Sequence, residues 1–438
     1  MEQLPDSIDY FSPLPQIPKG TQSISMVSQP INGSVFTAGS QIWVDLPQKG
    51  FLVPDSLAIR YKGSIGVVPT GGAASSMIGL PYLNPFVRSE VYCGSTQLEV
   101  IQQYNQVSTL VSNITMDVAQ KYALQSAYGY ATAGADLTMD KMDGRTCVNS
   151  TTLVDNFSIA GPLPNVISNA KKLIPLFLTG SMRVILTVDA ISNMFVTTTA
   201  NNIPTAFSIS NFELVYEIVD FGYEVERAIR MKAPKIFIKS QTLTNQAQVA
   251  QANTSGVQDY VFNIRNQSIK AVFASLSGTA ANSLNKWADS FDVSQRSGEY
   301  SLQIAGQNFP SRPLSALNNP TGILLELKRA SLAFGNDYSN IYDKQASASI
   351  NAAEFGYIDD STTATTLAVP SKFILGFHTE SLHNNNALLS GISTQNTPVT
   401  LRISSSTASV QAHNINLIVL ADALIEIDCE NAQVHTKV

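Results

Sequence analysis

Stretches in which apolar and polar residues alternate follow one another along most of the chain. Because successive side chains of a strand point to opposite faces, each such stretch predicts a β-strand with one buried face. Gly, Pro and Asn turns separate the stretches, which are rich in β-branched and aromatic residues. The clearest predicted strands are 41–46, 56–61, 89–93, 182–188 and 207–219 in the first half, and 259–264, 270–275, 300–304, 372–377, 399–403 and 415–427 in the second.

Helical periodicity is strongest in two segments. The first covers about 113–128, with Thr115 or Asp117 near its start and a row of apolar residues on one face. The second covers 321–334, directly after Pro320, where apolar residues recur at every third or fourth position. Each segment follows a predicted strand–turn–strand unit, so we expect both helices to pack on the flank of a sheet.

The length of 438 residues exceeds what one hydrophobic core usually supports, so two packed units are expected. We predict a first sandwich over 25–225 and a second over 226–438. Residues 1–24 are rich in proline, which predicts an extended arm. Tyr10 and Phe11 would be costly to leave in water, so the arm is predicted to lie along its own subunit or a neighbour. A disordered leader is the alternative.

The two halves share the spacing of their strands and turns. Three pairs of matching positions are each separated by 211 residues: 91 and 302, 98 and 309, and 180 and 391. The closing strands shift slightly, since Asn211 matches Asn414, and a difference in loop length accounts for that shift. Independent stretches would rarely share one offset, so the halves are predicted to be copies of one topology.

Charged residues make up 14% of the chain, well below the usual quarter, while the hydrophobic fraction is an ordinary 44%. A subunit that covers its exterior with copies of itself can replace surface charge with uncharged polar residues, so this deficit favours assembly. The net charge of −6 argues against a protein whose main task is to hold nucleic acid, since phosphate binding needs clustered cations.

The sequence also bears on compartment. No stretch reaches the roughly twenty apolar residues of a membrane-spanning helix, and the first residues lack the basic and apolar blocks of a signal peptide. Synthesis in a cytosol-like compartment is therefore expected.

The three cysteines, Cys93, Cys147 and Cys429, are far apart and show no metal-binding spacing, which predicts buried free thiols.

Motifs of known catalytic chemistry are missing from the sequence, so no catalytic residue and no cofactor is predicted. The segment 33–40 has two glycines but lacks the lysine of a phosphate-binding loop, and is interpreted as a turn. His378 and His383, with Glu380 between them, could hold a metal ion only if the following loop folded back. No metal site is predicted.

The densest group of basic residues lies where the two halves join, and consists of Arg227, Arg230, Lys232 and Lys235, followed by Lys239. One interpretation is that this segment faces the interior of an assembly, towards a membrane or an acidic partner. The other is local pairing with the nearby acidic residues Asp220, Glu224 and Glu226, which the sequence favours. The first four basic residues, with Tyr10 and Phe11, are the candidate inter-subunit or interior contacts.

Two regions of the second half resemble a known family. They are 299–313, a strand–turn–strand unit with the sequence EYSLQIAGQNFPSRP, and the end pair formed by 388–392 and 415–428. Together with the repeat, they resemble the double jelly-roll major capsid proteins of tectiviruses, adenoviruses, virophages and Polinton-like viruses, over nearly the whole chain. The resemblance implies an all-β chain of two tandem eight-stranded jelly-roll sandwiches with short flanking helices.

The resemblance also implies a function. Three chains would form a pseudo-hexameric homotrimer, and a lattice of such trimers would tile the icosahedral shell of a DNA virus. The partners would be other copies of the chain, a penton or vertex protein, and minor capsid or cement proteins. Whether an internal membrane is a further partner stays open. Sequence-specific nucleic-acid binding is not expected. The chain would be made in the host cytosol and located in the virion.

Two other classes of function stand as alternatives. A β-sandwich spike or carbohydrate-binding module would display an aromatic platform, but Trp43 and Trp287 fall in different halves and form no obvious platform. An enzyme built on a sandwich is disfavoured by the lack of catalytic motifs. The leading prediction is a coat subunit without catalysis of its own.

Overall fold

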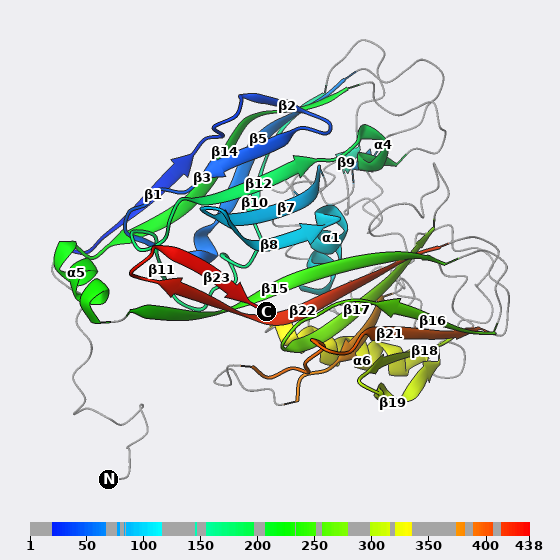
Figure 1. The fold of residues 1–438 in the computed structure, drawn as a ribbon. Coiled ribbons are helices and arrows are strands. Elements are labelled where there is room, and N and C mark those ends of the chain that lie inside the picture. Colours follow the sequence, from blue (N-terminus) through cyan, green and yellow to red (C-terminus); the bar gives the residue numbers. More distant parts are fainter. Residues whose placement is uncertain are drawn as a thin grey trace, which may run out of the picture.

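The computed structural model describes residues 20–66, 77–78, 83, 85–115, 145–146, 155–196, 206–232, 234–250, 256–278, 298–315, 320–334, 374–381, 389–405 and 413–438. Strands dominate these ranges, and Figure 1 shows that they form two lobes stacked one above the other. Strands β1 to β14 make the first lobe, at the top of Figure 1, and strands β15 to β23 make the second lobe.

The first lobe is a sandwich of two antiparallel sheets. One sheet has the order β10-β5-β14-β1, with the short strands β2, β4 and β11 added to it, and the other has the order β3-β12-β7-β8. The strands are β1 (Gln22–Ser28), β2 (Val35–Thr37), β3 (Gln41–Asp45), β4 (Phe51–Leu52), β5 (Ala58–Ile65), β7 (Phe86–Cys93), β8 (Thr96–Gln102), β10 (Asp155–Pro162), β11 (Ile174–Pro175), β12 (Met182–Val188) and β14 (Phe207–Asp220).

The second lobe repeats this plan. One sheet has the order β15-β22-β17-β20, with β23 also paired to β22, and the other has the order β16-β21-β18-β19. The strands are β15 (Lys235–Ala250), β16 (Gly256–Phe262), β17 (Ile269–Gly278), β18 (Gly298–Ile304), β19 (Gln307–Ser315), β20 (Ile374–His378), β21 (Val399–Ser405), β22 (His413–Asp428) and β23 (Gln433–Lys437).

The two lobes have the same strand order. Counting the eight main strands of each lobe along the chain, the first, eighth, third and sixth form one sheet, and the second, seventh, fourth and fifth form the other. This is the order of a jelly roll, in which two Greek keys share a sandwich. The predicted pair of eight-stranded jelly rolls with few helices is therefore confirmed.

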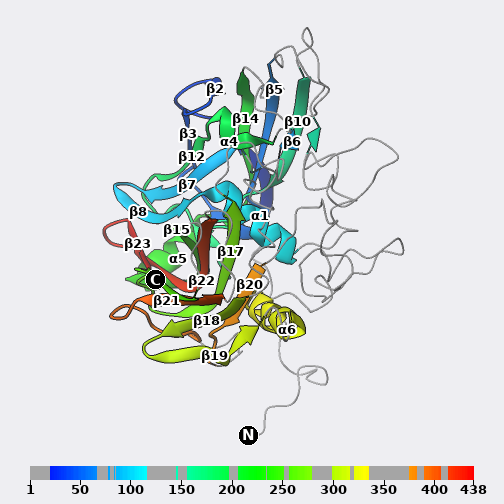
Figure 2. The same cartoon turned by 90° about the vertical axis from the view of Figure 1, so that its right-hand side faces the viewer.

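The hairpin of the fourth and fifth strands carries the predicted repeat most clearly. In the first lobe β7 ends at Cys93 and β8 begins at Thr96, while in the second lobe β18 ends at Ile304 and β19 begins at Gln307. Cys93 and Ile304 are 211 residues apart, and so are Thr96 and Gln307, which is the offset predicted from the sequence. A helix follows each hairpin, and Figure 2 shows α1 and α6 on the same side of the two lobes.

The second predicted helix is confirmed. It is α6 (Pro320–Ser331), which continues as the 3-10 turn η6 (Leu332–Phe334). Ile323, Leu327 and Ala330 recur at helical spacing and are all fully buried. The burial of one apolar stripe is what holds such a short helix, because an isolated helix of this length is marginal in water.

The predicted start of the first helix is wrong. The helix α1 (Tyr104–Thr115) begins well before Asn113, and the remaining predicted residues 116–128 lie outside the described residues. Tyr104, Val107 and Leu110 are buried and form its apolar face. Burial of this stripe against β7 outweighs the weak helix propensity of its Asn, Ser, Thr and Val residues.

Smaller elements complete the described part of the chain. They are η1 (Pro54–Ser56), α4 (Ile191–Met194), α5 (Tyr223–Lys232), and a small sheet of β6 (Met77–Ile78), β9 (Arg145–Thr146) and β13 (Phe195–Val196). The helix α5 connects β14 to β15, and the predicted domain boundary at 225/226 falls inside it. The strand β1 starts at Gln22, within the segment predicted as an arm.

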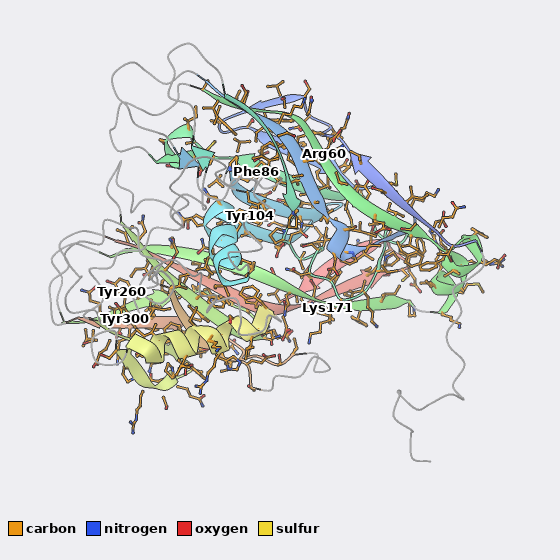
Figure 3. All side chains as sticks on the ribbon, turned by 180° about the vertical axis from the view of Figure 1, so that it is seen from behind. Arg60, Phe86, Tyr104, Lys171, Tyr260 and Tyr300 are labelled. Carbon is orange, nitrogen blue, oxygen red and sulfur yellow. The ribbon has the colours of Figure 1, made fainter. Side chains whose placement is uncertain are left out.

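Each lobe has an aromatic centre. In the first lobe Phe86, which is labelled in Figure 3, lies edge-on to Tyr61 and Phe212, with ring centroids 5.8 and 6.2 Å apart. In the second lobe Phe273 of β17 stacks on Phe334 of η6, with centroids 5.5 Å apart. Rings of this size, fully or largely buried, account for much of the apolar surface removed from water.

Candidate assembly interface

The two lobes meet along the free edge of β15. Within the described residues β15 pairs with β22 along one edge, and no strand pairs with its other edge. The loop that follows β10 in the first lobe occupies this side. The backbone N–H of Lys171 donates to the carbonyl of Lys239 at 2.9 Å, and the Asn169 side-chain amide donates to the carbonyl of Gln241 at 3.2 Å. The first lobe therefore caps an edge that would otherwise present unpaired backbone groups.

Side-chain hydrogen bonds continue this contact along β15. The Ser240 hydroxyl donates to the carbonyl of Val166 at 2.5 Å. Further along the strand, the Asn245 amide donates to the side-chain oxygen of Gln103 at 2.9 Å, next to the end of β8. Short polar side chains suit this position because they satisfy backbone groups on the neighbouring lobe without adding charge.

Glu99 of β8 brings a carboxylate into this polar contact. Its side chain accepts hydrogen bonds from the backbone N–H of Val166 at 2.7 Å and from the Thr242 hydroxyl of β15 at 2.5 Å. The residue is only 6% exposed. Burial raises the pKa of Glu99 to about 7, although the hydrogen bonds from Thr242, Val166 and Leu243 act in the opposite direction.

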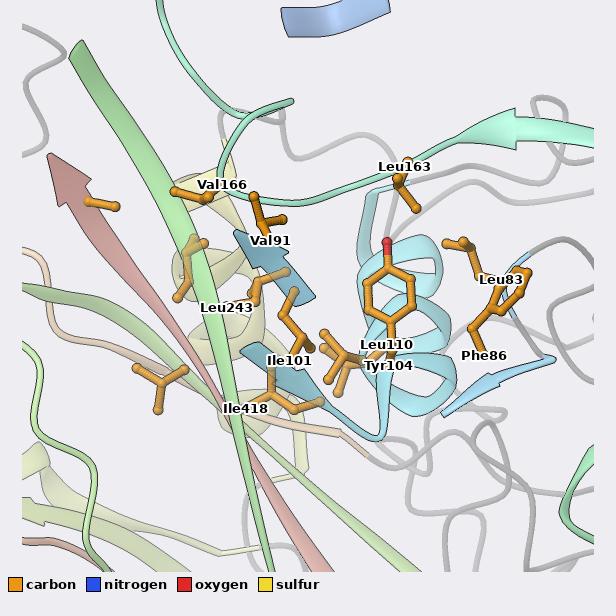
Figure 4. Close-up of a cluster of buried hydrophobic side chains, with 14 of the residues drawn as sticks. Leu83, Phe86, Val91, Ile101, Tyr104, Leu110, Leu163, Val166, Leu243 and Ile418 are labelled. Carbon is orange, nitrogen blue, oxygen red and sulfur yellow. The ribbon is translucent and has the colours of Figure 1, made fainter. Parts of the chain in front are cut away.

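An apolar layer lies beside this polar contact. Figure 4 shows Val91 and Ile101 of the first lobe close to Leu243 and Ile418 of the second lobe. All four side chains are at most 3% exposed and belong to one continuous cluster of buried residues that spans both lobes. The junction is therefore a packed core and not a loose contact between independent domains.

A second contact joins the lobes near α5. The N–H of Gly180 donates to the carbonyl of Ala432, in the turn between β22 and β23, at 3.1 Å. The guanidinium of Arg230 donates to the carbonyl of Phe177 at 3.0 Å and lies over the Phe177 ring, 5.4 Å from its centroid. The segment 177–180 of the first lobe is thus held from both the connecting helix and the second lobe.

The candidate contact residues predicted from the basic segment lie on two different elements. Arg227, Arg230 and Lys232 lie on α5, a helix with no buried residue, whereas Lys235 begins β15. Tyr10 and Phe11 lie outside the described residues. Within the described part of the chain, the predicted pairing of these bases with Asp220, Glu224 and Glu226 is not found, and Asp220 pairs instead with Lys49 at 3.8 Å.

The basic residues that do form ion pairs reach across the β15–β22 ladder. Lys235 contacts Glu426 at 2.6 Å, and Lys239 contacts Asp422 at 3.9 Å. Lys437 of β23 contacts Glu426 from the other side at 2.5 Å. The hydrogen bonds from Lys235 and Lys437 lower the pKa of the Glu426 carboxyl to about 2, and the Glu426 carboxylate raises the pKa of Lys235.

Substitution of Lys235 by glutamine should therefore raise the pKa of Glu426 above 2, because one of the two cations that favour its ionised form is removed. The titration of the side-chain carboxyl in an NMR pH series measures this shift. Lys232→Gln, on the exposed helix α5, is the matched control and should leave the Glu426 midpoint unchanged. An unshifted midpoint in the Lys235 variant would contradict the pairing.

A buried polar cluster fastens the loop between β20 and β21. Glu380 accepts from the Ser390 hydroxyl at 2.6 Å and contacts Lys270 at 3.2 Å, and Asp422 accepts from the Ser268 hydroxyl at 2.8 Å. All of these groups have charged or hydroxyl partners, as buried polar residues require. The cluster is built to hold the loop in place.

The predicted thiols lie far in the sequence from the candidate metal ligands. Cys93 is buried and Cys429 half-buried, both as free thiols, which confirms the prediction for Cys93 and in part for Cys429. Cys147 lies outside the described residues. His378 Nε2 is 3.9 Å from Glu380 Oε2, while His383 is not among the described residues. In the ranges that the structure describes, no three His, Cys, Asp or Glu side chains converge on a point that could hold a metal ion.

The described part of the first lobe has a pocket at its surface. This pocket of about 340 Å³ is lined by Gln29, Arg60, Tyr61, Lys62, Ser158, Asn211 and Glu213. Arg60 and Glu213 pair with each other within it, and the Tyr61 ring is buried in the core. The face of Trp43 is covered by the Arg183 guanidinium, 5.3 Å from the ring centroid.

No helix in the described residues is long and apolar enough to cross a bilayer.

Comparison of the sequence with protein-family models and with curated proteins gives no match. Solved structures do match. The Faustovirus major capsid protein has a TM-score of 0.60 at 9% identity, covering 96% of this chain and 92% of that chain. The PBCV-1 virus capsid gives 0.56 at 11% identity, covering 98% and 99%. The mavirus major capsid protein gives 0.53 at 11% identity, covering 100% and 95%.

These similarities extend over the whole length of each chain, so both lobes and their connection are shared. The chain has the double jelly-roll fold, and the resemblance predicted from the sequence is confirmed at the level of the fold. The identities of 9 to 11% are too low to carry residue roles from those proteins to this one.

Proposed function

We propose that this double jelly-roll chain is the major capsid protein of a virus, and that it forms pseudo-hexameric homotrimers that tile an icosahedral shell. The observation that carries the proposal is the duplication itself. Two lobes of identical strand order are fixed to each other by a buried junction, and solved capsid proteins share this fold from end to end. With two like lobes per chain, a threefold axis alone gives six lobes around a ring.

The low charge of the chain supports an assembled state. With 14% charged residues, its exterior depends on uncharged polar groups, which can be buried between copies at small desolvation cost. The same proposal includes a structural role without catalysis, synthesis in the host cytosol and a location in the virion shell. It also includes contacts with a vertex protein, with minor capsid or cement proteins, and with an internal membrane where one is present.

The mass of the purified protein in solution tests this proposal. Light scattering should give three times the chain mass of 47.2 kDa, and electron microscopy of the same fraction should show blocks with six lobes. A chain that stays monomeric at high concentration would contradict the proposal and would favour the alternative of a sandwich-built binding module.

A further inference from the structure

The pocket of the first lobe lies on four neighbouring strands of one sheet, in the order β10-β5-β14-β1. Ser158 of β10 is the ladder partner of Lys62 of β5. Arg60, which Figure 3 labels on β5, is the ladder partner of Glu213 of β14. Gln29 directly follows the end of β1 and completes the row. The pocket is therefore built mainly on paired strands, which hold their side chains in fixed positions.

A β-bulge in β14 shapes the pocket. The β14–β5 ladder shifts register between Ser210 and Glu213, so Asn211 and Phe212 together stand opposite a single residue of β5. Asn211 has a φ of 48°, in the left-handed region that is uncommon outside glycine. The extra residue lets Phe212 stay in the core, where it is 2% exposed, while Asn211 reaches the surface and lines the pocket.

The jelly roll itself does not require this bulge. The counterpart of Asn211 in the sequence repeat is Asn414 of β22, which stands in regular register opposite Ser277 of β17. The shift in that ladder lies at its other end, next to Ile269. Bulges and left-handed residues are frequent beside binding sites, where they redirect side chains at some cost in stability. The bulge at Asn211 is therefore a feature of the first lobe and not of the shared fold.

The polar lining of the pocket carries one cation in excess. The Arg60 side chain donates to a carboxylate oxygen of Glu213 at 2.6 Å, so these two charges balance each other. Lys62 has no ion-pair partner among the residues that the structure describes. The other polar side chains of the lining are two amides and a hydroxyl, from Gln29, Asn211 and Ser158. All three can both donate and accept hydrogen bonds.

These properties select a class of ligand. One negative charge on the ligand would form a charge-assisted hydrogen bond with Lys62. Ring hydroxyl groups, which also donate and accept, would match the amides and the hydroxyl beside it. The volume of about 340 Å³ is at the lower end of the range for small-molecule sites, which suits a single sugar ring. An apolar ligand would find no aromatic surface there, because the Tyr61 side chain is buried.

We propose that this pocket binds an acidic monosaccharide, with the carboxylate of the sugar on Lys62 and its hydroxyl groups on the neighbouring amides and hydroxyl. The inference goes beyond the proposed structural role, since a coat subunit with this site would also recognise an acidic glycan. It does not depend on the trimer, because all lining residues belong to one lobe of one chain.

Saturation-transfer NMR of the purified protein with glucuronic acid and with N-acetylneuraminic acid tests the inference. At least one of the two acids should bind with a Kd of about 1 mM. Glucose, which lacks the carboxylate, should bind at least about 10-fold more weakly, because it cannot form the charge-assisted hydrogen bond with Lys62.

Three variants locate the binding. Lys62→Gln should weaken the binding of the acidic sugar by about 10-fold. Asn211→Gly should weaken it too, since the amide is lost while glycine keeps the positive φ without strain. Lys49→Gln is the matched control, because it removes the same charge from an exposed lysine of the same lobe outside the lining, and it should leave the affinity unchanged. Circular dichroism shows that each variant is folded.

The inference is overturned if neither acid binds to the wild-type protein, or if Lys62→Gln binds the acids as tightly as the wild type does. Inorganic phosphate is the last probe. If it binds as tightly as the acidic sugars, the pocket holds a simple anion and the inference is wrong. None of these results changes the mass of the particle in solution, which tests the proposed function separately.

Discussion

Gly391→Ala is expected to lower the free energy of unfolding by about 3 kcal/mol, because a side chain at this position meets backbone that cannot move aside. A Cβ on Gly391 would lie 2.8 Å from the amide nitrogen of Ile269, and closer still to its carbonyl group. The same backbone is fixed by a reciprocal pair of hydrogen bonds between Ile269 and Ile392, at 2.8 and 3.0 Å. The backbone at Gly391 is fixed as well, because its N–H donates a hydrogen bond to the Ser268 hydroxyl at 2.8 Å.

Chemical denaturation of Gly391→Ala beside two glycine controls measures this effect. Gly180→Ala, at the matching turn of the first lobe, brings its Cβ to 3.3 Å from the carbonyl of Ala432 and should cost much less. Gly33→Ala meets only the edge of the Phe36 ring at 3.4 Å and should change the stability by less than about 0.5 kcal/mol. Equal stabilities for the three variants would show that the turn at 390–391 is not as tightly packed as described.

Glu99→Gln is expected to remove a pH dependence of stability of about 3 kcal/mol between pH 4.5 and pH 7. The pKa of Glu99 is raised by burial from 4.5 to about 7 in the folded protein. Below pH 4.5 the carboxyl is protonated in both the folded and unfolded states, so its contribution to stability is fully present. As the pH rises to 7, the unfolded chain releases the proton while the folded chain keeps it, and that contribution is lost.

The glutamine side chain fits the contacts of the protonated acid. Its oxygen can accept from the Val166 N–H, and its amide can donate to the Thr242 hydroxyl, which lies 2.5 Å from Glu99 in the wild type. The variant should therefore be more stable than the wild type at pH 8 and similar to it at pH 4.5. Denaturation at a series of pH values gives the difference. Parallel curves for wild type and variant across this range would contradict the burial of an ionisable group at the junction.

The strand pattern and the repeat could be predicted from the sequence because both depend on local order. In strands such as Met182–Val188, apolar residues alternate with polar ones or follow one another directly. The turn after Ile304 has the same spacing as its counterpart in the first lobe. Burial of one face fixes the register of such strands, so the sequence pattern is retained in the fold. The jelly-roll order followed from the resemblance, not from the pattern.

The strand β15 shows why other elements were missed. The sequence of β15 carries Gln, Thr and Asn through most of its second half, with little alternation. It forms a strand because β22 pairs with all of it and the first lobe covers its other edge. Both partners are distant in sequence, so no local signal announces the strand.

Glu99 was missed for a related reason. In the sequence TQLEVIQ of β8, alternation would place Leu98 and Glu99 on opposite faces and send the carboxylate to solvent. The register between β7 and β8 shifts at Val91 and Tyr92, and the neighbouring lobe closes over the strand. A bulge and a contact from another lobe together bury a group that the local pattern marks as exposed.

The central claim is that a chain of two like lobes assembles as a homotrimer with six lobes around a ring. A cryo-electron microscopy reconstruction of the purified assembly tests it most directly. The account predicts a threefold block of six lobes, two from each chain. A twofold dimer, or a chain that stays monomeric, would contradict it.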